Sequence, residues 1–375
     1  MKTSVKLIPF ALLNVIACAA DFMAEQPAEF ARCVPADAKV TKLAGGFGFI
    51  EGPVWVKDGG YLVFSDIPRD VLHKWTPSGS VTTFRQPSRN TNGNTIDAAG
   101  RLLSCEHSGR RVAVTEKDGT LRTLVDAFEG KKLNSPNDVV VKSDGTIWFT
   151  DPEYGLKTNP QTKRREGKEQ PGNFVYRHDP RTGSITAVAR DFDQPNGLAF
   201  SPGERRLYVA DSGKPRHIRV FDVAADGTLS GGSVFCTIDK GGPDGIRVDT
   251  EGRVWSSTGD GVQVFGTDGR RVGRILLPEG AANLCFGGED GRTLFMTART
   301  SLSGQPLLRW RGWPHALHDR ADLAVFGADG DRRRRPLSAA RTYSRSAASS
   351  ASFERSPLVS FTWAAIDCPL RRLWV

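Results

Sequence analysis

Apolar residues along most of the chain occur in short runs that alternate with polar positions, as in half-buried β-strands, and Gly-containing turns separate the runs. The stretch "NSPNDVVVKSDGTIWFTDP", from Asn134 to Pro152, shows the pattern: a polar start, an apolar strand, a turn and a second apolar strand. With 40 Gly, 22 Pro and few apolar runs at helical spacing, the chain is predicted to be all-β.

This pattern occurs six times between residues 51 and 300, and each copy begins with an amide or acidic residue, here called a leader residue. The leader residues are Glu51, Asn92, Asn137, Asn196, Asp244 and Asn283. They are separated by 41, 45, 59, 48 and 39 residues, which leaves room for about four short strands in each interval. We therefore predict a six-bladed β-propeller over residues 38–300, with residues 38–44 supplying the strand that closes the ring.

If each leader residue begins the innermost strand of its blade, all six should surround one mouth of the central channel. A single Asn or Asp at such a position is explained by its preference for turns, but six of six favour a site. Two carboxylates and several amide oxygens, without His or Cys, suit Ca²⁺ first, then Mg²⁺ or Mn²⁺, and Zn²⁺ less. A cation at a channel mouth is suited to the hydrolysis of an ester-like bond.

Several phrases of the sequence resemble the gluconolactonase/regucalcin-like family of six-bladed propellers, from about residue 45 to 300. They are "EGPVW", "NTNGNTIDAAGRLLSCEH", "NSPNDVVV", "FTDPEYGL", "QPNGLAFSP", "LYVADS" and "GGPDGIRVDTEGRVW". The resemblance implies a metal-dependent lactonase. Its metal ligands, carried over motif by motif, would be Glu51, Asn137, Asn196 and Asp244.

The resemblance also implies two roles in catalysis. Asp244 would act as general base or nucleophile, and Asn92 would contact the substrate. Asp138 is expected to orient its neighbour Asn137.

Other candidates come from the ends of the second strands. Glu106 is grouped with the substrate-binding candidates, and His107 is either an alternative proton carrier or a structural histidine. Asp151 and Asp211 are interpreted mainly as turn-capping groups. Three tryptophans at strand positions are predicted to pack between blades: Trp55, Trp148 and Trp255.

The leading hypothesis is an enzyme that opens sugar lactones such as glucono-1,5-lactone with a divalent cation, Ca²⁺ before Mg²⁺, Mn²⁺ or Zn²⁺. Two alternatives stay open: an organophosphate or aryl-ester hydrolase with the same metal ligands, and a propeller that binds a ligand without catalysis. The sequence has no G-x-S-x-G elbow, P-loop or dinucleotide-binding fingerprint. It leaves the physiological lactone and the oligomeric state open.

The N-terminus has Lys2 and Lys6 before a short apolar run, which predicts a secretory signal over residues 1–19 and export to the periplasm or the medium. Cleavage after Ala19 and acylation of Cys18 as a lipid anchor both fit; a buried strand or helix of a cytosolic protein is the alternative. The five other cysteines are scattered, which argues against a zinc site and allows at most two disulfides.

Residues 301–375 have no strand periodicity and are predicted to be a poorly ordered tail. The tail is either a frameshift product or a recent extension, and an Arg-rich anchor for anionic surfaces is the alternative. Without further strands from this region, completion of the sixth blade is in question. The net charge of +9 is concentrated here, because the tail has 12 Arg, no Lys and six acidic residues. The remainder of the chain is close to neutral, so nucleic-acid binding is not expected.

Overall fold

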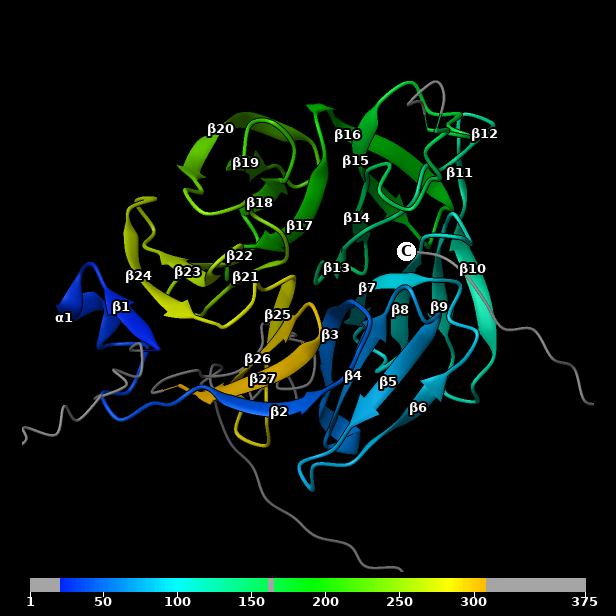
Figure 1. Ribbon diagram of the computed structural model, residues 1–375. Helices are drawn as coiled ribbons and strands as arrows, with labels where there is room; N and C mark the ends of the chain where they lie inside the picture. Colours follow the sequence, from blue (N-terminus) through cyan, green and yellow to red (C-terminus); the bar gives the residue numbers. More distant parts are fainter. Residues whose placement is uncertain (1–20, 161–164, 308–375) are drawn as a thin grey trace, which may run out of the picture. The chain divides into compact units, whose positions relative to one another are not determined.

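In the computed structural model, which describes residues 21–160 and 165–307, the chain forms six antiparallel sheets that follow one another around a central channel (Figure 1). The predicted six-bladed β-propeller is thereby confirmed. The predicted signal over residues 1–19, Cys18 and the predicted tail beyond residue 307 lie outside the described residues.

Each blade has four strands of its own, and in the first five blades these strands follow the order of the chain from the channel outward. In the last blade the outermost strand comes from the N-terminal part of the chain. Blades 1 and 2 consist of β3 (Ile50–Val56), β4 (Tyr61–Asp66), β5 (Val71–Trp75) and β6 (Val81–Arg85), then β7 (Thr91–Ile96), β8 (Leu102–Glu106), β9 (Arg111–Thr115) and β10 (Leu121–Val125). A small hairpin follows, β11 (Ala127–Phe128) and β12 (Lys131–Lys132). Blades 3 and 4 consist of β13 (Val139–Val141), β14 (Ile147–Asp151), β15 (Asn173–Asp179) and β16 (Ser184–Phe192), then β17 (Pro195–Phe200), β18 (Arg206–Asp211), β19 (His217–Val223) and β20 (Leu229–Thr237).

The last two blades include strands from the N-terminal part of the chain. Blade 5 consists of β21 (Ile246–Val248), β22 (Val254–Thr258), β23 (Gly261–Phe265) and β24 (Arg271–Leu276), and β1 (Phe22–Ala24) adds a fifth strand at its outer edge. Blade 6 consists of β25 (Asn283–Gly287), β26 (Thr293–Ala298), β27 (Ser301–Pro306) and β2 (Thr41–Gly45).

The core of the propeller lies between the blades. The described residues contain six clusters of buried apolar side chains, and each cluster joins two neighbouring blades. Trp148 and Trp255 belong to two of these clusters, and Trp55 packs against a third while it stacks on Phe295. The predicted packing of the tryptophans between blades is confirmed. Every blade thus depends on both of its neighbours for burial of its apolar faces.

Polar contacts near the channel also join neighbouring blades. The backbone N–H groups of Gly93, Gly197 and Gly245 donate to the carbonyl oxygens of Asn137 (2.7 Å), Asp244 (3.1 Å) and Ala282 (2.9 Å). At two other junctions, the hydroxyls of Ser65 and Thr150 donate to the carbonyl oxygens of Asn92 (2.6 Å) and Asn196 (2.8 Å). At the sixth, the Asn283 amide donates to Glu51 Oε2 (2.9 Å). All six junctions are therefore bonded at or beside a leader residue.

The ring closes as predicted, because β2 pairs with β27. The last blade nevertheless extends past the predicted boundary at residue 300, since the six residues of β27 form its third strand. The stretch "SLSGQP" has Leu302 as its one large apolar side chain, which is buried, so it lacks the alternation that identifies a strand. The four-strand blade resolves the doubt about its completion.

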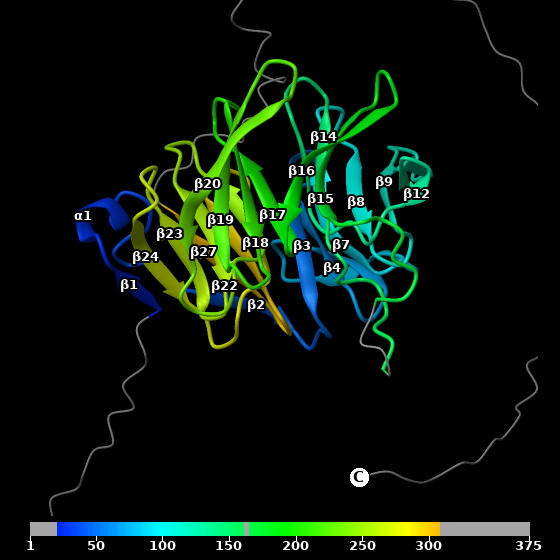
Figure 2. The same cartoon turned by 90° about the horizontal axis from the view of Figure 1, so that it is seen from above.

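Residues before the predicted start at residue 38 also belong to the folded domain. The short helix α1 (Pro27–Phe30) and β1 lie beside β24 in both views (Figures 1 and 2). Phe30 and Val34 join the cluster between blades 5 and 6, and Arg253 forms an ion pair with Glu29 at 3.1 Å. A three-residue strand and a one-turn helix are too short to give a periodic signal.

Four cysteines lie in the described part of the chain, and all are buried free thiols: Cys33, Cys105, Cys236 and Cys285. Neither of the two disulfides that the sequence allowed is therefore formed among them. Within the same residues, no helix is long and apolar enough to cross a membrane.

A chain that ends at Thr300 is expected to unfold at a much lower temperature than a chain that ends at Leu307. Removal of β27 exposes the core beneath Leu302 and leaves β2 without its partner, a larger loss than one core truncation at about 2–5 kcal/mol. Thermal unfolding followed by circular dichroism compares the two chains. Equal unfolding temperatures would contradict the role of β27 in ring closure.

Candidate active site

The structure places every leader residue at the channel end of an innermost strand. Glu51, Asn92, Asn196 and Asn283 lie at the start of β3, β7, β17 and β25, whereas Asn137 and Asp244 lie just before β13 and β21. The innermost strands contact one another in turn around the central axis (Figure 1), so all six positions lie at the same end of the propeller. Five leader residues are buried, and Asp244 is half-buried.

Three carboxylates from different blades form an acidic cluster at this mouth: Glu51, Asp138 and Asp244. The Asn283 amide donates to Glu51 Oε2 at 2.9 Å and to Asp138 Oδ2 at 3.4 Å. Burial raises the pKa of Glu51 well above its ordinary value, and the charges of Asp244 and Asp138 raise it further. Burial and then the Asp138 charge raise the pKa of Asp244 to about 7, against a hydrogen bond from the Asn196 side chain. The side chains of Glu51, Asn196 and Asp244 are therefore brought together as predicted.

The donor atoms of this mouth fit a hard divalent cation. No group of three or more His, Cys, Asp and Glu side chains within residues 21–160 and 165–307 is arranged to hold a metal ion, so a cation here would depend on amide oxygens as well. Asn137 and Asn196 supply amides at leader positions, and both are buried. Mutually repelling carboxylates beside amide oxygens form the all-oxygen ligand set that Ca²⁺ or Mg²⁺ prefers.

Asn92 and His107 form a second polar group, in blade 2. Asn92 Nδ2 lies 3.2 Å from His107 Nε2, and Asn92 Oδ1 is buried without a hydrogen-bond partner. Burial lowers the pKa of His107 to about 4, so the imidazole is neutral at physiological pH and a weak base there. Asp244, with a pKa near 7, is better matched to accept a proton.

Glu106 lies at the end of β8, fully buried, and its carboxylate is bonded to arginines. Arg111 Nε donates to its Oε2 at 2.6 Å and Arg85 Nη2 to its Oε1 at 3.4 Å, while Arg89 is 3.8 Å away. The carboxylate of Glu106 is therefore paired with arginines and buried. The geometry does not support its predicted contact with substrate.

Aspartates at the ends of second strands hold the loops that lead to the leader residues. Asp151 accepts from the backbone N–H of Asn134 at 2.8 Å, and Asp211 accepts from those of Asp193 and Gln194, both at 2.9 Å. Their predicted role as turn-capping groups is confirmed. Each lies in the same blade as a predicted ligand, Asn137 or Asn196, and fixes the approach of the chain to it.

Glycines that follow the leader residues permit the close approach of the blades. A Cβ atom on Gly197 would lie 2.4 Å from the carbonyl oxygen of Asp244, and one on Gly245 would lie 2.1 Å from the side chain of Asn283. Both distances are shorter than any packed structure tolerates, so only glycine fits. The hydrophobic pattern of the sequence does not report this requirement, because it depends on the backbone and side chains of the neighbouring blade.

Tyr154 also lies near the acidic cluster, although the sequence pattern gave it no role. It lies on the loop after β14, its side chain is 40% exposed, and its hydroxyl is hydrogen-bonded to Ser212. Burial and then the charge of Asp244 raise its pKa to about 12, which places the ring near the acidic cluster. An exposed aromatic residue on a loop gives no periodic signal, so only its place in "FTDPEYGL" marked it.

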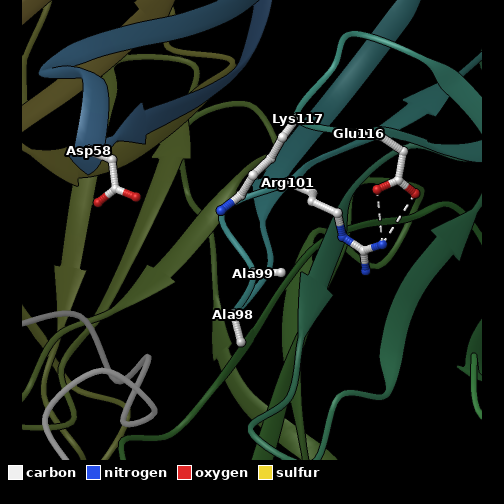
Figure 3. Close-up of a pocket in the computed structure, with 6 residues that line it drawn as sticks. All are labelled: Asp58, Ala98, Ala99, Arg101, Glu116 and Lys117. Atoms are coloured by element: carbon white, nitrogen blue, oxygen red, sulfur yellow. Dashed lines mark hydrogen bonds and ion pairs between the residues drawn. The ribbon is translucent and has the colours of Figure 1, made fainter. Parts of the chain in front are cut away.

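A groove of about 440 Å³ lies elsewhere on the propeller, between blades 1 and 2 (Figure 3). Its lining residues are Asp58, Ala98, Ala99, Arg101, Glu116 and Lys117. They belong to the turns that follow β3, β7 and β9, and the ends of β3 and β7 at these turns are opposite to the ends that contain Glu51 and Asn92. Arg101 is paired with Glu116 at 3.2 Å. The groove contains no leader residue and is separate from the candidate site.

The chain is similar to known proteins in sequence and in fold. The family model described as the SMP-30/Gluconolactonase/LRE-like region matches residues 49–300. The chain is 34% identical to a gluconolactonase of Zymomonas mobilis over 68% of this chain and 78% of that protein, and 28% identical to pentonolactonase XacC of Haloferax volcanii over 66% and 80%. A solved gluconolactonase structure from Xanthomonas campestris is 38% identical, with a TM-score of 0.70 over 75% of this chain and 93% of that one.

Asp151→Asn is expected to change the stability of the protein in a pH-dependent way. Burial raises the pKa of Asp151 from 3.8 to about 7, and its Oδ1 is buried without a partner. The stabilisation from the protonated group is therefore complete below the unfolded pKa and is lost as pH rises through about 7. The free energy of unfolding of the variant should equal that of the parent near pH 4 and exceed it at pH 8 by up to about 4 kcal/mol.

Denaturant unfolding at pH 4, 6 and 8 measures this difference. Asp222→Asn, at an exposed position of β19, is the control and should show no such trend. A stability difference for Asp151→Asn that stays constant over the three pH values would show that Asp151 is ionised throughout.

Gly197→Ala is expected to lower the stability by about 1–3 kcal/mol, because the added methyl collides with the backbone of the next blade. Gly203→Ala is the matched control, since a Cβ there meets no atom within 4 Å. Thermal unfolding of both variants checks the prediction. Equal effects would mean that the inner strands can separate without cost.

Proposed function

The chain belongs to the SMP-30/gluconolactonase/LRE-like family, and we propose that its channel-mouth site hydrolyses sugar lactones with the help of a divalent cation. The enzyme is a lactonase that acts on ester bonds: relatives named gluconolactonase, pentonolactonase and 6-deoxy-6-sulfogluconolactonase share its sequence over most of their length. The observation that carries the metal-dependent part is the cluster of mutually repelling buried carboxylates, beside amide groups, at the one mouth of the channel.

The cation would be held by Glu51, Asn137, Asn196 and Asp244. When bound, a dication supplies Lewis acidity that polarises the lactone carbonyl and lowers the pKa of water. The all-oxygen ligand set favours Ca²⁺, with Mg²⁺, Mn²⁺ and Zn²⁺ as weaker candidates. The relatives named regucalcin support a divalent cation, and its identity is part of the proposal.

The residues of this chain account for the proton and for the position of the substrate. Asp244 is the leader residue that solvent reaches, and its carboxylate suits a base that takes a proton from the attacking water and returns it to the ring oxygen as the ester bond breaks. Asn92 is held by His107, and its unpartnered Oδ1 can accept a hydrogen bond from a sugar hydroxyl. Water adds to the lactone, and the products are a carboxylic acid and a free hydroxyl on one open chain.

Two further parts of the proposal rest on the sequence alone. Export depends on the predicted signal over residues 1–19, and anchoring depends on acylation of Cys18. Hydrolysis of organophosphates or aryl esters by the same residues is the alternative activity, and a panel of sugar lactones and phosphotriesters separates the two.

Asp244→Asn is expected to lower the rate of glucono-1,5-lactone hydrolysis by about 100-fold or more, because the amide cannot accept the proton. Chelation with EDTA should abolish the activity of the parent protein, and added Ca²⁺ should restore it. Acid release during lactone opening measures both effects, with spontaneous hydrolysis subtracted.

Asp222→Asn serves again as the control, since it removes an exposed carboxylate far along blade 4 and should leave the rate unchanged. Full activity of Asp244→Asn would refute the assignment of the base. Full activity after chelation would refute the metal dependence and leave a cation-independent lactonase.

A further inference from the structure

Arg247 is a buried cation next to Asp138 of the acidic cluster. It is the middle residue of β21, three positions after Asp244, and only 7% of its surface is exposed. Its Nη1 lies 3.6 Å from Asp138 Oδ2 and donates to the carbonyl oxygen of Ile246 at 2.7 Å. The backbone contact fixes the guanidinium on the strand, so its charge has a defined place beside Asp138.

Asp138 connects Arg247 to the proposed cation site. Its Oδ2 receives the ion pair from Arg247 and, at 3.4 Å, the amide of Asn283, which also donates to Glu51 Oε2. Its Oδ1 accepts from the backbone N–H of Val139 at 2.9 Å. Asp138 is therefore held from three sides at a short distance from Glu51.

The charges around the mouth can be counted from these contacts. Glu51, Asp138 and Asp244 contribute three negative charges when ionised, and Arg247 contributes one positive charge. The net charge is −2, equal and opposite to that of a dication. Because these groups are buried, water screens their interactions weakly, and each unit of charge has a large effect on the affinity for an ion.

We propose that Arg247 is a positioning residue that holds the net charge of the cation site at −2 and thereby lowers the preference of the site for trivalent over divalent ions. The inference rests on the proposed cation site, which it deepens by assigning the source of charge selectivity. The ion pair with Asp138 acts on the bound ion through the field of both groups. A merely structural ion pair would affect stability and leave the relative affinities for the two classes of ion unchanged.

Four proteins form a charge series that tests the proposal: the parent, Arg247→Met, Asp138→Asn and the double variant with both changes. Their sites carry −2, −3, −1 and again −2. The probes are Ca²⁺ and Tb³⁺, which are similar in size and differ in charge. Calorimetric titration gives the affinity for Ca²⁺, and Tb³⁺ luminescence under direct excitation gives that for Tb³⁺.

The ratio of the Tb³⁺ affinity to the Ca²⁺ affinity is the expected readout. It should rise by about tenfold or more in Arg247→Met, fall by a similar factor in Asp138→Asn, and return to the parent ratio in the double variant. Arg247→Lys, which keeps the charge, should keep the parent ratio. If Arg247→Met does not fold, the fall in Asp138→Asn and its reversal in the double variant carry the same test.

Each contrary result has a distinct meaning. An unchanged ratio in the single variants, with both ions still bound, overturns the role of Arg247 and leaves the cation site standing. A shift of both single variants in the same direction also overturns it, because a disturbed structure and not charge would be the cause. Failure of the parent protein to bind either ion overturns the proposed cation site and the inference together.

Discussion

The close approach of six β-strands around the channel is the constraint on which the rest of this structure depends. At every junction between blades a hydrogen bond at or beside a leader residue joins one blade to the next. The blades come so close there that a side chain on Gly197 or Gly245 would collide with the neighbouring blade. The same packing that closes the ring therefore places six polar residues from distant parts of the chain at the same end of the propeller.

That arrangement is electrostatically unfavourable in the absence of a cation, and this repulsion is the reason for proposing a cation site. Three carboxylates share a buried region with few cations: burial raises the pKa of each, the Asp138 charge raises the pKa of Glu51 and Asp244 further, and the Asp244 charge adds to the shift of Glu51. Under the proposed function, a divalent ion would offset the repulsion and make the unfavourable cluster a binding site. Arg247 balances one carboxylate from within the protein, and the bound ion would balance the other two. Catalysis then needs little more than a half-exposed base and an amide that can hold the substrate.

The periodic parts of the molecule could be predicted from the sequence, and the aperiodic parts could not. Each repeat contains its own evidence, so the six blades, the leader residues and the packed tryptophans were all identified. β27 was not predicted because its residues are mostly small or polar. β1 and α1 were not predicted because they are too short to show a period. Arg247 and Tyr154 gain their meaning from neighbours on other blades, and no local pattern reports such contacts. Glu106 looked available as a strand-end acid, and only the structure reveals the arginines around it.

The last blade unites β2, near the beginning of the described chain, with β25, β26 and β27, near its end. During synthesis on the ribosome, β2 has no strand to pair with until more than 250 intervening residues have been made, because Thr41 pairs with Gly304. Such distant pairing makes completion of the fold a late event. Glu51 and Asn283 meet only where the first and last blades join, so the proposed cation site is not assembled in a nascent polypeptide until the circle is complete.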